Sequence, residues 1–432
     1  MAVVAEVAAE RDLDSDRLSV HTCSMQVSRR RFVLFVSAAM SMAAMAIDLL
    51  IPAFSDMRKE FGLVEGSSRI GLVITVFFLG LAIGQLFYGT LSDRYGRRPM
   101  MLVGLGIYIV ASIVAGFANS LPLLFAARIV TGIGAAGPRS LAVAMVRDVY
   151  DGVEMARLMS FVMTVFMIVP ILAPSFGALL ISVLPWQSVL FFPALAGSIV
   201  AFLCWKMPET LPLDRRRSLS FTDLRSAAGM VVRNRRTMAY TMVTTLTFSS
   251  MASYLGRSQP LIADLYDHER EFPIIFGVIA GVMAVTTLAN SRLIPRFGLQ
   301  NMLSGATTML VVFTALLTVV VLAADGKPPL LLLCVLLACI MATKGLVMPN
   351  ANTAAMQPMG AVAGTASSII GVITSLFGAV LSGLVTRVYD PTARTLALAM
   401  FVFAVGSAGC VAYARFRTTD PSSVPAVALA NA

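Results

Sequence analysis

Long apolar runs constrain this chain more than any other feature. Each run has about 20 residues, the length that an α-helix needs to cross the ~30 Å hydrocarbon core of a bilayer. Hydrophobic residues make up 58% of the 432 residues and charged residues only 13%, a balance that a soluble domain could not bury. The sequence therefore predicts an all-α polytopic membrane protein with twelve transmembrane helices. The runs lie at 32–54, 70–91, 99–118, 121–146, 157–182, 187–206, 237–262, 272–293, 299–323, 328–349, 363–387 and 394–416.

The basic residues predict how the chain is oriented. The formal net charge is +10, but Lys and Arg cluster at the ends of apolar runs, where membrane topology accounts for them and nucleic-acid binding is not implied. Arg29, Arg30 and Arg31 precede the first run, and further basic residues fill the stretch between the sixth and seventh. Because cytoplasmic loops carry the excess of Lys and Arg, we expect both termini in the cytoplasm and the spans in the inner (plasma) membrane.

Several classes of function have no support in the sequence. The chain has two histidines and five cysteines, and neither residue type is clustered, so we expect no metal and no cofactor. A membrane-embedded enzyme would need a clustered nucleophile, base or metal set within the spans, and none is present, so no residue is predicted to be catalytic. The sequence also lacks a G-x-x-x-x-G-K-S/T phosphate-binding loop, which argues against ATP as the energy source.

A short charged connection joins the second and third runs. It contains glycines that end helices and three arginines against one aspartate, so we place it at the cytoplasmic surface. Its pattern, G-x-L-S-D-R-Y-G-R-R, resembles the signature loop between helices 2 and 3 of the major facilitator superfamily. The resemblance implies a conformational gate in which the aspartate contacts the other half of the protein near the start of span eleven. The gate residues are Gly89, Asp93, Arg94, Gly96, Arg97 and Arg98.

An internal repeat predicts two six-helix halves. Arg94-Tyr95-Gly96 after the second run is echoed by Arg296-Phe297-Gly298 after the eighth. In the superfamily, two such halves are related by an axis along the membrane normal and enclose a site near the midplane. We divide the chain into an N-terminal cytoplasmic tail, a first bundle, a cytoplasmic linker, a second bundle and a C-terminal cytoplasmic tail. These units span 1–31, 32–206, 207–236, 237–416 and 417–432.

Asp48 lies inside the first run, with no base near it in sequence. A charged group in a membrane span costs roughly 2.5–3.5 kcal/mol on insertion scales, and it usually faces a cavity or a partner. We interpret Asp48 as a carboxylate that couples transport to protons by cycling between its acidic and anionic forms. In the alternative interpretation, Asp48 is an interfacial acid near the outer end of the span. Asp56 is interpreted as such an acid.

Arg128 lies in the fourth run, in a pattern similar to the R-x-x-x-G-x-G-A-A motif of the superfamily, with Thr131 in place of the usual glutamine. An arginine cannot discard its proton, so within hydrocarbon it needs an acid, a carbonyl group or water. Asp48 is the obvious candidate partner, and the pair would serve proton coupling. In the alternative interpretation, Arg128 reaches the outer surface or braces the helices.

Three further features lie within the spans. The fifth run holds a pattern similar to the G-P-x-x-G motif of the superfamily's antiporters, with Ala173 in place of the first glycine, and we expect it to form a bent, closely packed interface between the halves. Its residues are Pro170, Ala173, Pro174 and Gly177. Arg139 and Lys344 lie in the cytoplasmic thirds of their runs, where they either extend to the surface or contribute weakly to the site.

The uncharged stretch 348–368 resembles a segment of the bicyclomycin-resistance (Bcr/CflA) drug and proton antiporters, through Pro-Asn-Ala-Asn and Ala-Gly-Thr-Ala-Ser-Ser. With the other motifs, the resemblance covers nearly all twelve runs. It implies a proton-coupled antiporter, expected to act as a monomer, whose partners are protons, the lipid bilayer and a small amphipathic molecule that it exports. A proton-coupled importer and a specific metabolite exporter of the same fold are the alternatives, and the proline motif disfavours the importer.

Overall fold

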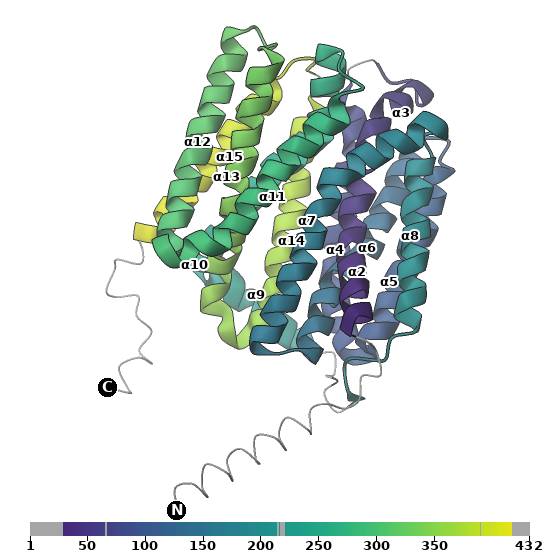
Figure 1. Cartoon of the computed structure of the whole chain (residues 1–432). Helices are drawn as coiled ribbons and strands as arrows, with labels where there is room; N and C mark the ends of the chain where they lie inside the picture. Colours follow the sequence, from purple (N-terminus) through teal and green to yellow (C-terminus); the bar gives the residue numbers. More distant parts are fainter. Residues whose placement is uncertain (1–28, 65–66, 214–215, 217–220, 389, 417–432) are drawn as a thin grey trace, which may run out of the picture.

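The computed structural model describes residues 29–416 except 65–66, 214–215, 217–220 and 389. Residues 1–28 of the predicted N-terminal tail 1–31, and the whole predicted C-terminal tail 417–432, therefore lie outside the described residues. Long α-helices follow one another throughout the described part, as the apolar runs predict (Figure 1). The helices up to the linker are α2 (Arg29–Asp48), α3 (Phe54–Glu60), α4 (Leu72–Tyr95), α5 (Arg97–Gly116), α6 (Leu121–Val149), α7 (Gly152–Val183) and α8 (Ser188–Trp205).

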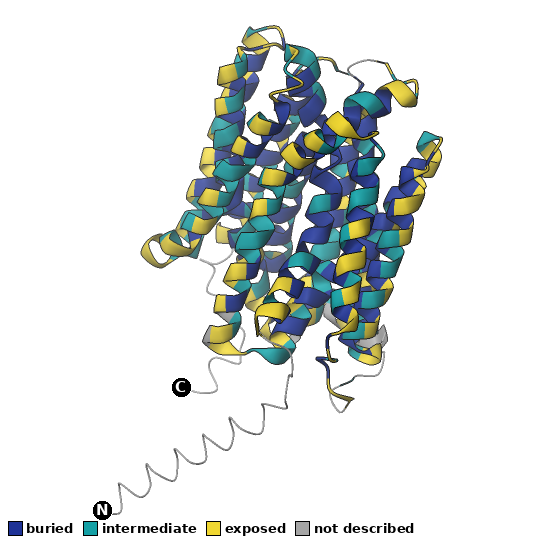
Figure 2. Cartoon of the chain, turned by 45° about the vertical axis from the view of Figure 1, so that its right-hand side comes forward, coloured by how far each residue is buried: buried dark blue, intermediate teal, exposed yellow. Residues whose placement is uncertain are grey.

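The linker contributes the helix α9 (Phe221–Arg233), and six long helices follow it. These are α10 (Arg235–Gln259), α11 (Phe272–Phe297), α12 (Leu299–Ala323), α13 (Leu330–Met356), α14 (Ala363–Arg387) and α15 (Arg394–Phe416). We call α2–α8 the first half and α10–α15 the second half. The halves meet where α4 packs against α14 and α7 against α11. Exposed residues follow the outward faces of the helices, and buried residues lie where helices face one another (Figure 2).

Eleven helices in the described part are long and apolar enough to cross a membrane. The predicted seventh span, α10, has the length of a span but is not among them, because threonine and serine occupy much of it. Its buried hydroxyls donate to carbonyl oxygens one turn earlier, as between Thr245 and Thr241 and between Ser249 and Thr245, both at 2.8 Å. These hydroxyls are thus satisfied within the helix, which packs against α13, α14 and α15.

Small residues bring α4 and α6 into backbone contact. A Cβ atom at Gly80 would lie 1.9 Å from the carbonyl oxygen of Ile129, and one at Gly132 would lie 2.1 Å from that of Phe77. Neither position has room for a side chain, so the glycines of both apolar runs act as packing residues. This contact fixes the height at which α6 presents Arg128 to the rest of the first half.

The two ends of the helix bundle differ. The start of α2, the end of α15 and the connection between α4 and α5 lie at one end, which we call the termini side, and the far end is the opposite side (Figure 1). On the opposite side, Ser68 Oγ donates to the carbonyl oxygen of Thr386 at 2.8 Å, and a Cβ atom at Gly71 would lie 2.1 Å from the carbonyl oxygen of Gly256. The halves are therefore in direct contact there.

Candidate functional site

The first span is broken at Asp48. Helix α2 ends at this residue, and a 3-10 turn, η1 (Ile51–Ala53), leads into α3. Pro52 lacks an N–H group, so it cannot donate to the carbonyl oxygen of Asp48 four residues earlier. Leu50 donates its N–H to the carbonyl oxygen of Ile47 instead of continuing the helix, which leaves the carbonyl oxygen of Ala46 without its usual helical donor. The apolar run 32–54 is thus two helical pieces with an acid at the joint.

Asp48 is buried at this break. Only 4% of its surface is exposed, and the side chain has no hydrogen bond or ion pair within the described part of the chain. Its interpretation as an interfacial acid does not fit this burial. Asp56 is different: it is half-buried and lines a surface groove on the opposite side. For a buried carboxylate without a cationic partner, the protonated form and the ionised form differ strongly in energy.

Arg128 also binds the break, through a backbone oxygen and not through the Asp48 carboxylate. Its Nη2 donates to the carbonyl oxygen of Ala46 at 2.9 Å, and its guanidinium lies 4.7 Å from the centre of the Phe77 ring. The arginine is 1% exposed, so it does not extend to the surface. The expected pair with Asp48 is not formed in this conformation, because the broken helix offers Arg128 an unpaired carbonyl oxygen instead.

Two tyrosines that the sequence analysis did not single out also belong to the site. Tyr108 Oη, from α5, donates to the carbonyl oxygen of Met42 at 3.0 Å. Tyr254, from α10, is buried, its hydroxyl has no hydrogen bond within the described residues, and it lies close enough to Asp48 for the two groups to interact electrostatically. Asp48 therefore has a polar group of the second half in its neighbourhood. The serine-rich sequence around Tyr254 is the signal that could have indicated it.

The proline motif packs against the break. A Cβ atom at Gly177 would lie 2.4 Å from the carbonyl oxygen of Leu49, so α7 touches the backbone of the turn that follows Asp48. Pro170 and Pro174 lie inside α7, and a Cβ atom at Gly277 of α11 would lie 2.9 Å from the carbonyl oxygen of Ile171. Ala173 between them is buried. The motif thus contacts both the break and the second half.

The charged connection between α4 and α5 centres on Arg97, which is buried. Its Nη1 lies 2.6 Å from Asp93 Oδ1 and its Nε lies 2.9 Å from Asp148 Oδ2. Asp93 remains 44% exposed and is paired within its own half. Gly89 lies nearer the second half, since a Cβ atom there would be 3.4 Å from Ser368 Oγ of α14. The expected contact of Asp93 with α14 is therefore not made in this conformation.

Glu209 is a partner of this connection that the sequence analysis missed. Its carboxylate accepts hydrogen bonds from the backbone N–H groups of Arg97 at 2.8 Å and Arg98 at 3.2 Å, at the start of α5. Gly96 has a φ of +103°, and a Cβ atom there would collide with Glu209. Arg94 is exposed beside the Tyr95 ring. A carboxylate at a helix N-terminus stabilises the helix start, so Glu209 fixes the geometry of the connection.

Lys344 does not extend to the surface. It lies near the middle of α13, has 0% exposure, and its Nζ has no hydrogen bond within the described residues. The sequence placed it in the cytoplasmic third of its span because the run 328–349 ends early, whereas α13 continues to Met356. Arg139 in α6 is half-buried.

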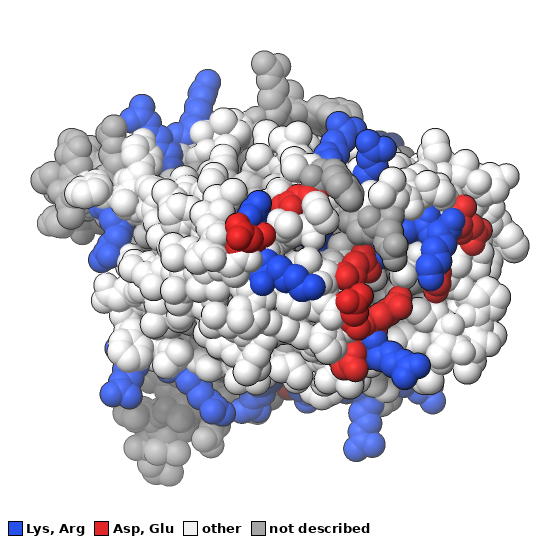
Figure 3. Space-filling model, turned by 90° about the horizontal axis from the view of Figure 1, so that it is seen from above, with Lys and Arg blue, Asp and Glu red and all other residues white. Residues whose placement is uncertain are grey.

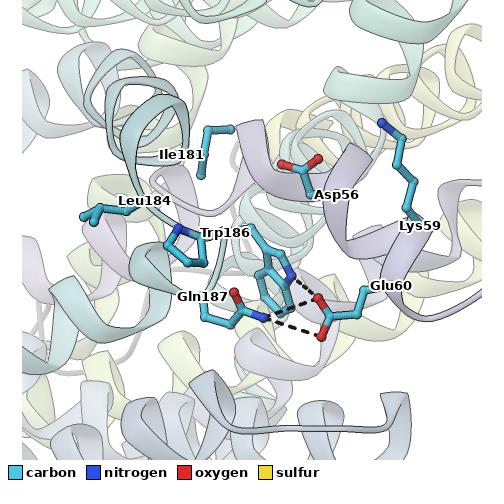
Figure 4. Close-up of a pocket in the computed structure, with 8 residues that line it drawn as sticks. Asp56, Lys59, Glu60, Ile181, Leu184, Trp186 and Gln187 are labelled. Atoms are coloured by element: carbon cyan, nitrogen blue, oxygen red, sulfur yellow. Dashed lines mark hydrogen bonds between the residues drawn. The ribbon is translucent and has the colours of Figure 1, made fainter.

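The structure also shows a groove of about 650 Å³ on the opposite side (Figure 4). All of its lining residues belong to the first half. Glu60 accepts hydrogen bonds there from Trp186 Nε1 and Gln187 Nε2. The remaining lining residues are Asp56, Lys59, Ile181, Leu184 and Pro185. Because the groove lies outside the interface between the halves, we do not assign the central site to it. Within the described residues, no cluster of His, Cys, Asp or Glu could hold a metal ion.

A polytopic helical protein with a discontinuous span and buried charges at the break is typical of secondary transporters. Residues 34–383 match the Major Facilitator Superfamily, and the chain belongs to this superfamily of transporters; it is not an enzyme. The D-xylose-proton symporter has the same fold, with a TM-score of 0.72 and 11% identity over 89% of this chain and 97% of that one. The expected twelve-helix major facilitator fold is thereby confirmed.

Relatives of known sequence support the narrower resemblance. The chain is 24% identical to the bicyclomycin resistance protein homolog of Haemophilus influenzae, over 87% of this chain and 94% of the relative. It is 27% identical to the multidrug resistance protein MdtL of Escherichia coli, over 76% and 83%. It is 28% identical to the uncharacterized MFS-type transporter YdgK of Bacillus subtilis, over 83% and 89%. The resemblance to bicyclomycin-resistance transporters is confirmed.

Proposed function

We propose that this protein exports drugs or other small amphipathic molecules across the inner membrane in exchange for protons. The observation that carries the proposal is Asp48, a carboxylate that is 4% exposed and has no ion-pair partner at the break of the first span. Such a group gains from protonation while it is buried and from ionisation when the site opens to water. The relatives named for drug resistance support export as the direction.

The surroundings of Asp48 suggest how protonation is coupled to movement. The break is held on one side by Arg128 and on another by Gly177, both of the first half. Tyr254 of the second half lies close enough to interact electrostatically with the carboxylate. When the halves rock, Tyr254 moves relative to Asp48, so the energy of the ionised carboxylate differs between the two states. We propose that this difference links proton binding to alternating access.

The termini side is proposed to face the cytoplasm, with the protein acting as a monomer. In the present conformation the opposite side is closed and Asp93 is paired with Arg97. We propose that Asp93 exchanges this partner for the start of α14 when the termini side closes, so that residues 89–98 act as the gate of that side. The contact would be favourable because a carboxylate gains from the free N–H groups of a helix start.

Everted membrane vesicles test the direction and the coupling together. Their lumen is acidified by respiration, a fluorescent dye reports the luminal pH, and bicyclomycin or ethidium is added outside. An exporter that exchanges protons for substrate moves the substrate inward and protons outward, so the lumen becomes more alkaline than in vesicles without the protein. A proton-coupled importer gives no such change, because its substrate and protons move in the same direction. That result would contradict the proposal.

A further inference from the structure

Arg58 of α3 reaches across to the second half on the opposite side. Its Nη1 donates to Gln259 Oε1 at 2.8 Å, and its Nη2 lies 2.7 Å from Asp264 Oδ2. The side chain of Arg58 is 4% exposed although this end of the molecule carries many solvated charges (Figure 3). A buried guanidinium of the first half is therefore held by an amide and a carboxylate of the second half.

The two acceptors of Arg58 are also bonded to each other. Gln259 is the last residue of α10, and Asp264 ends the π-helical turn η4 (Pro260–Asp264) that follows it. Gln259 Nε2 donates to Asp264 Oδ1 at 3.0 Å, which orients the amide oxygen and the carboxylate toward Arg58. The wide turn thus presents both acceptors as one site, and π-helical turns occur frequently at functional positions.

Close backbone contacts surround this ion pair. Ser68 donates to the carbonyl oxygen of Thr386 at 2.8 Å, and Gly71 lies against Gly256 without room for a Cβ atom. These contacts also join the first half to the second half. They are short-range and lack charge, so they add complementarity, while Arg58 and Asp264 form the one ion pair that joins the two halves among the described residues.

We propose that Arg58, Gln259 and Asp264 form a lock that closes the opposite side and must open in every transport cycle. The inference rests on the proposed alternating-access function. In the closed state the removal of one partner leaves the other charge buried and unpaired, whereas in the open state both charges are solvated and the removal costs little. A variant that lacks one partner should therefore shift the population toward the state that is open on the opposite side.

The distance between nitroxide labels on the opposite side tests the lock in the purified full chain. The labels are attached at Phe117→Cys of the first half and Leu331→Cys of the second half, in a background without the five native cysteines; both positions are exposed. We expect Arg58→Ala and Asp264→Asn each to increase a longer-distance population by about tenfold or more. The exchange Arg58→Asp with Asp264→Arg should return the distribution toward that of the parent.

Arg394→Ala is the matched control. It removes an ion pair with Asp325 on the same side, but that pair is exposed and lies within the second half, so the distances should stay as in the parent. Gln259→Ala removes no charge, so it should cause a smaller shift of the distance distribution. It serves in place of Arg58→Ala or Asp264→Asn if one of these variants does not fold. Parent-like distances in Arg58→Ala, Asp264→Asn and Gln259→Ala would overturn the lock. No substrate or proton gradient is used, so this result is independent of the export proposal.

Discussion

Arg128 binds the carbonyl oxygen of Ala46, two residues before the carboxylate of Asp48, at 2.9 Å. The hydrogen bond exists because the first span breaks at Asp48 and releases that oxygen from the helical pattern. A fixed positive charge thereby holds the backbone that positions the proposed proton-binding group. The two charged residues are linked through the backbone of α2 and form no direct ion pair in this conformation.

We expect Arg128→Ala to lower both thermal stability and transport. The change leaves the oxygen of Ala46 without a donor and removes a hydrogen bond from a charged group, which costs about 1.5–3 kcal/mol. Thr131→Ala, one turn further along α6, is the control, because the Thr131 hydroxyl bonds only within its own helix, to the carbonyl oxygen of Ala127. Thermal unfolding in detergent measures the difference. Equal midpoints for the two variants would show that Arg128 does not hold the break.

The contact between α7 and the break predicts a strong effect at Gly177. Gly177→Ala places a Cβ atom 2.4 Å from the carbonyl oxygen of Leu49 and must displace one of the two segments, so we expect lower stability and slower transport. In Gly106→Ala of α5 the new Cβ atom meets nothing within 4 Å. That variant should unfold at the same temperature as the parent or slightly above it, because alanine favours the helix. A Gly177→Ala protein as stable and active as Gly106→Ala would refute the tight contact.

The burial of Lys344 predicts that replacing this residue by an uncharged one stabilises the protein. Its ammonium group is buried without a hydrogen bond in the described structure, and the burial of an unpaired charge is unfavourable. Lys344→Met keeps most of the volume and removes the charge, so the unfolding temperature should rise. Lys327→Met, at an exposed position beside Tyr266, should change it little. A lower unfolding temperature for Lys344→Met would mean that the ammonium group has a stabilising partner.

The connection between α14 and α15 predicts a dependence of stability on pH. Burial opposes the ionisation of Asp390, but hydrogen bonds from Thr392 and from the backbone N–H of Thr395 outweigh it and hold the pKa of the carboxyl below its usual range. A lowered pKa stabilises the fold above the unfolded-state value of about 4, and this contribution is lost as the pH falls through and below that value.

The variant Asp390→Asn tests this dependence. It should be less stable than the parent near neutral pH, and the difference should shrink as the pH is lowered toward the pKa of Asp390. Unfolding temperatures measured at a series of pH values provide the comparison. A constant difference across the series would show that ionisation of Asp390 does not contribute.

The helices were predictable because span length and hydropathy depend on local sequence, and the buried acid at Asp48 was predictable because few charges occur in the runs. The break in the first span was not predictable, because its cause is a single missing N–H group at Pro52. Its consequence is a hydrogen bond to Ala46 from Arg128, which is 82 positions away in the sequence. Glu209 and Tyr254 reach their partners from other segments of the chain, a relationship that only the packing of helices defines. The full burial of Lys344 likewise depends on neighbours from other helices.

Gradient-driven transport by Asp48→Asn tests the central claim most directly. The variant is compared with Asp56→Asn, which changes a half-buried acid of α3 beyond the break. Both are reconstituted in liposomes, and uptake of a fluorescent substrate such as ethidium is followed with and without a pH gradient. We expect Asp48→Asn to lose the stimulation by the gradient and to retain ethidium binding, while Asp56→Asn resembles the parent. Full stimulation of Asp48→Asn by the pH gradient would contradict the assignment of proton coupling to Asp48.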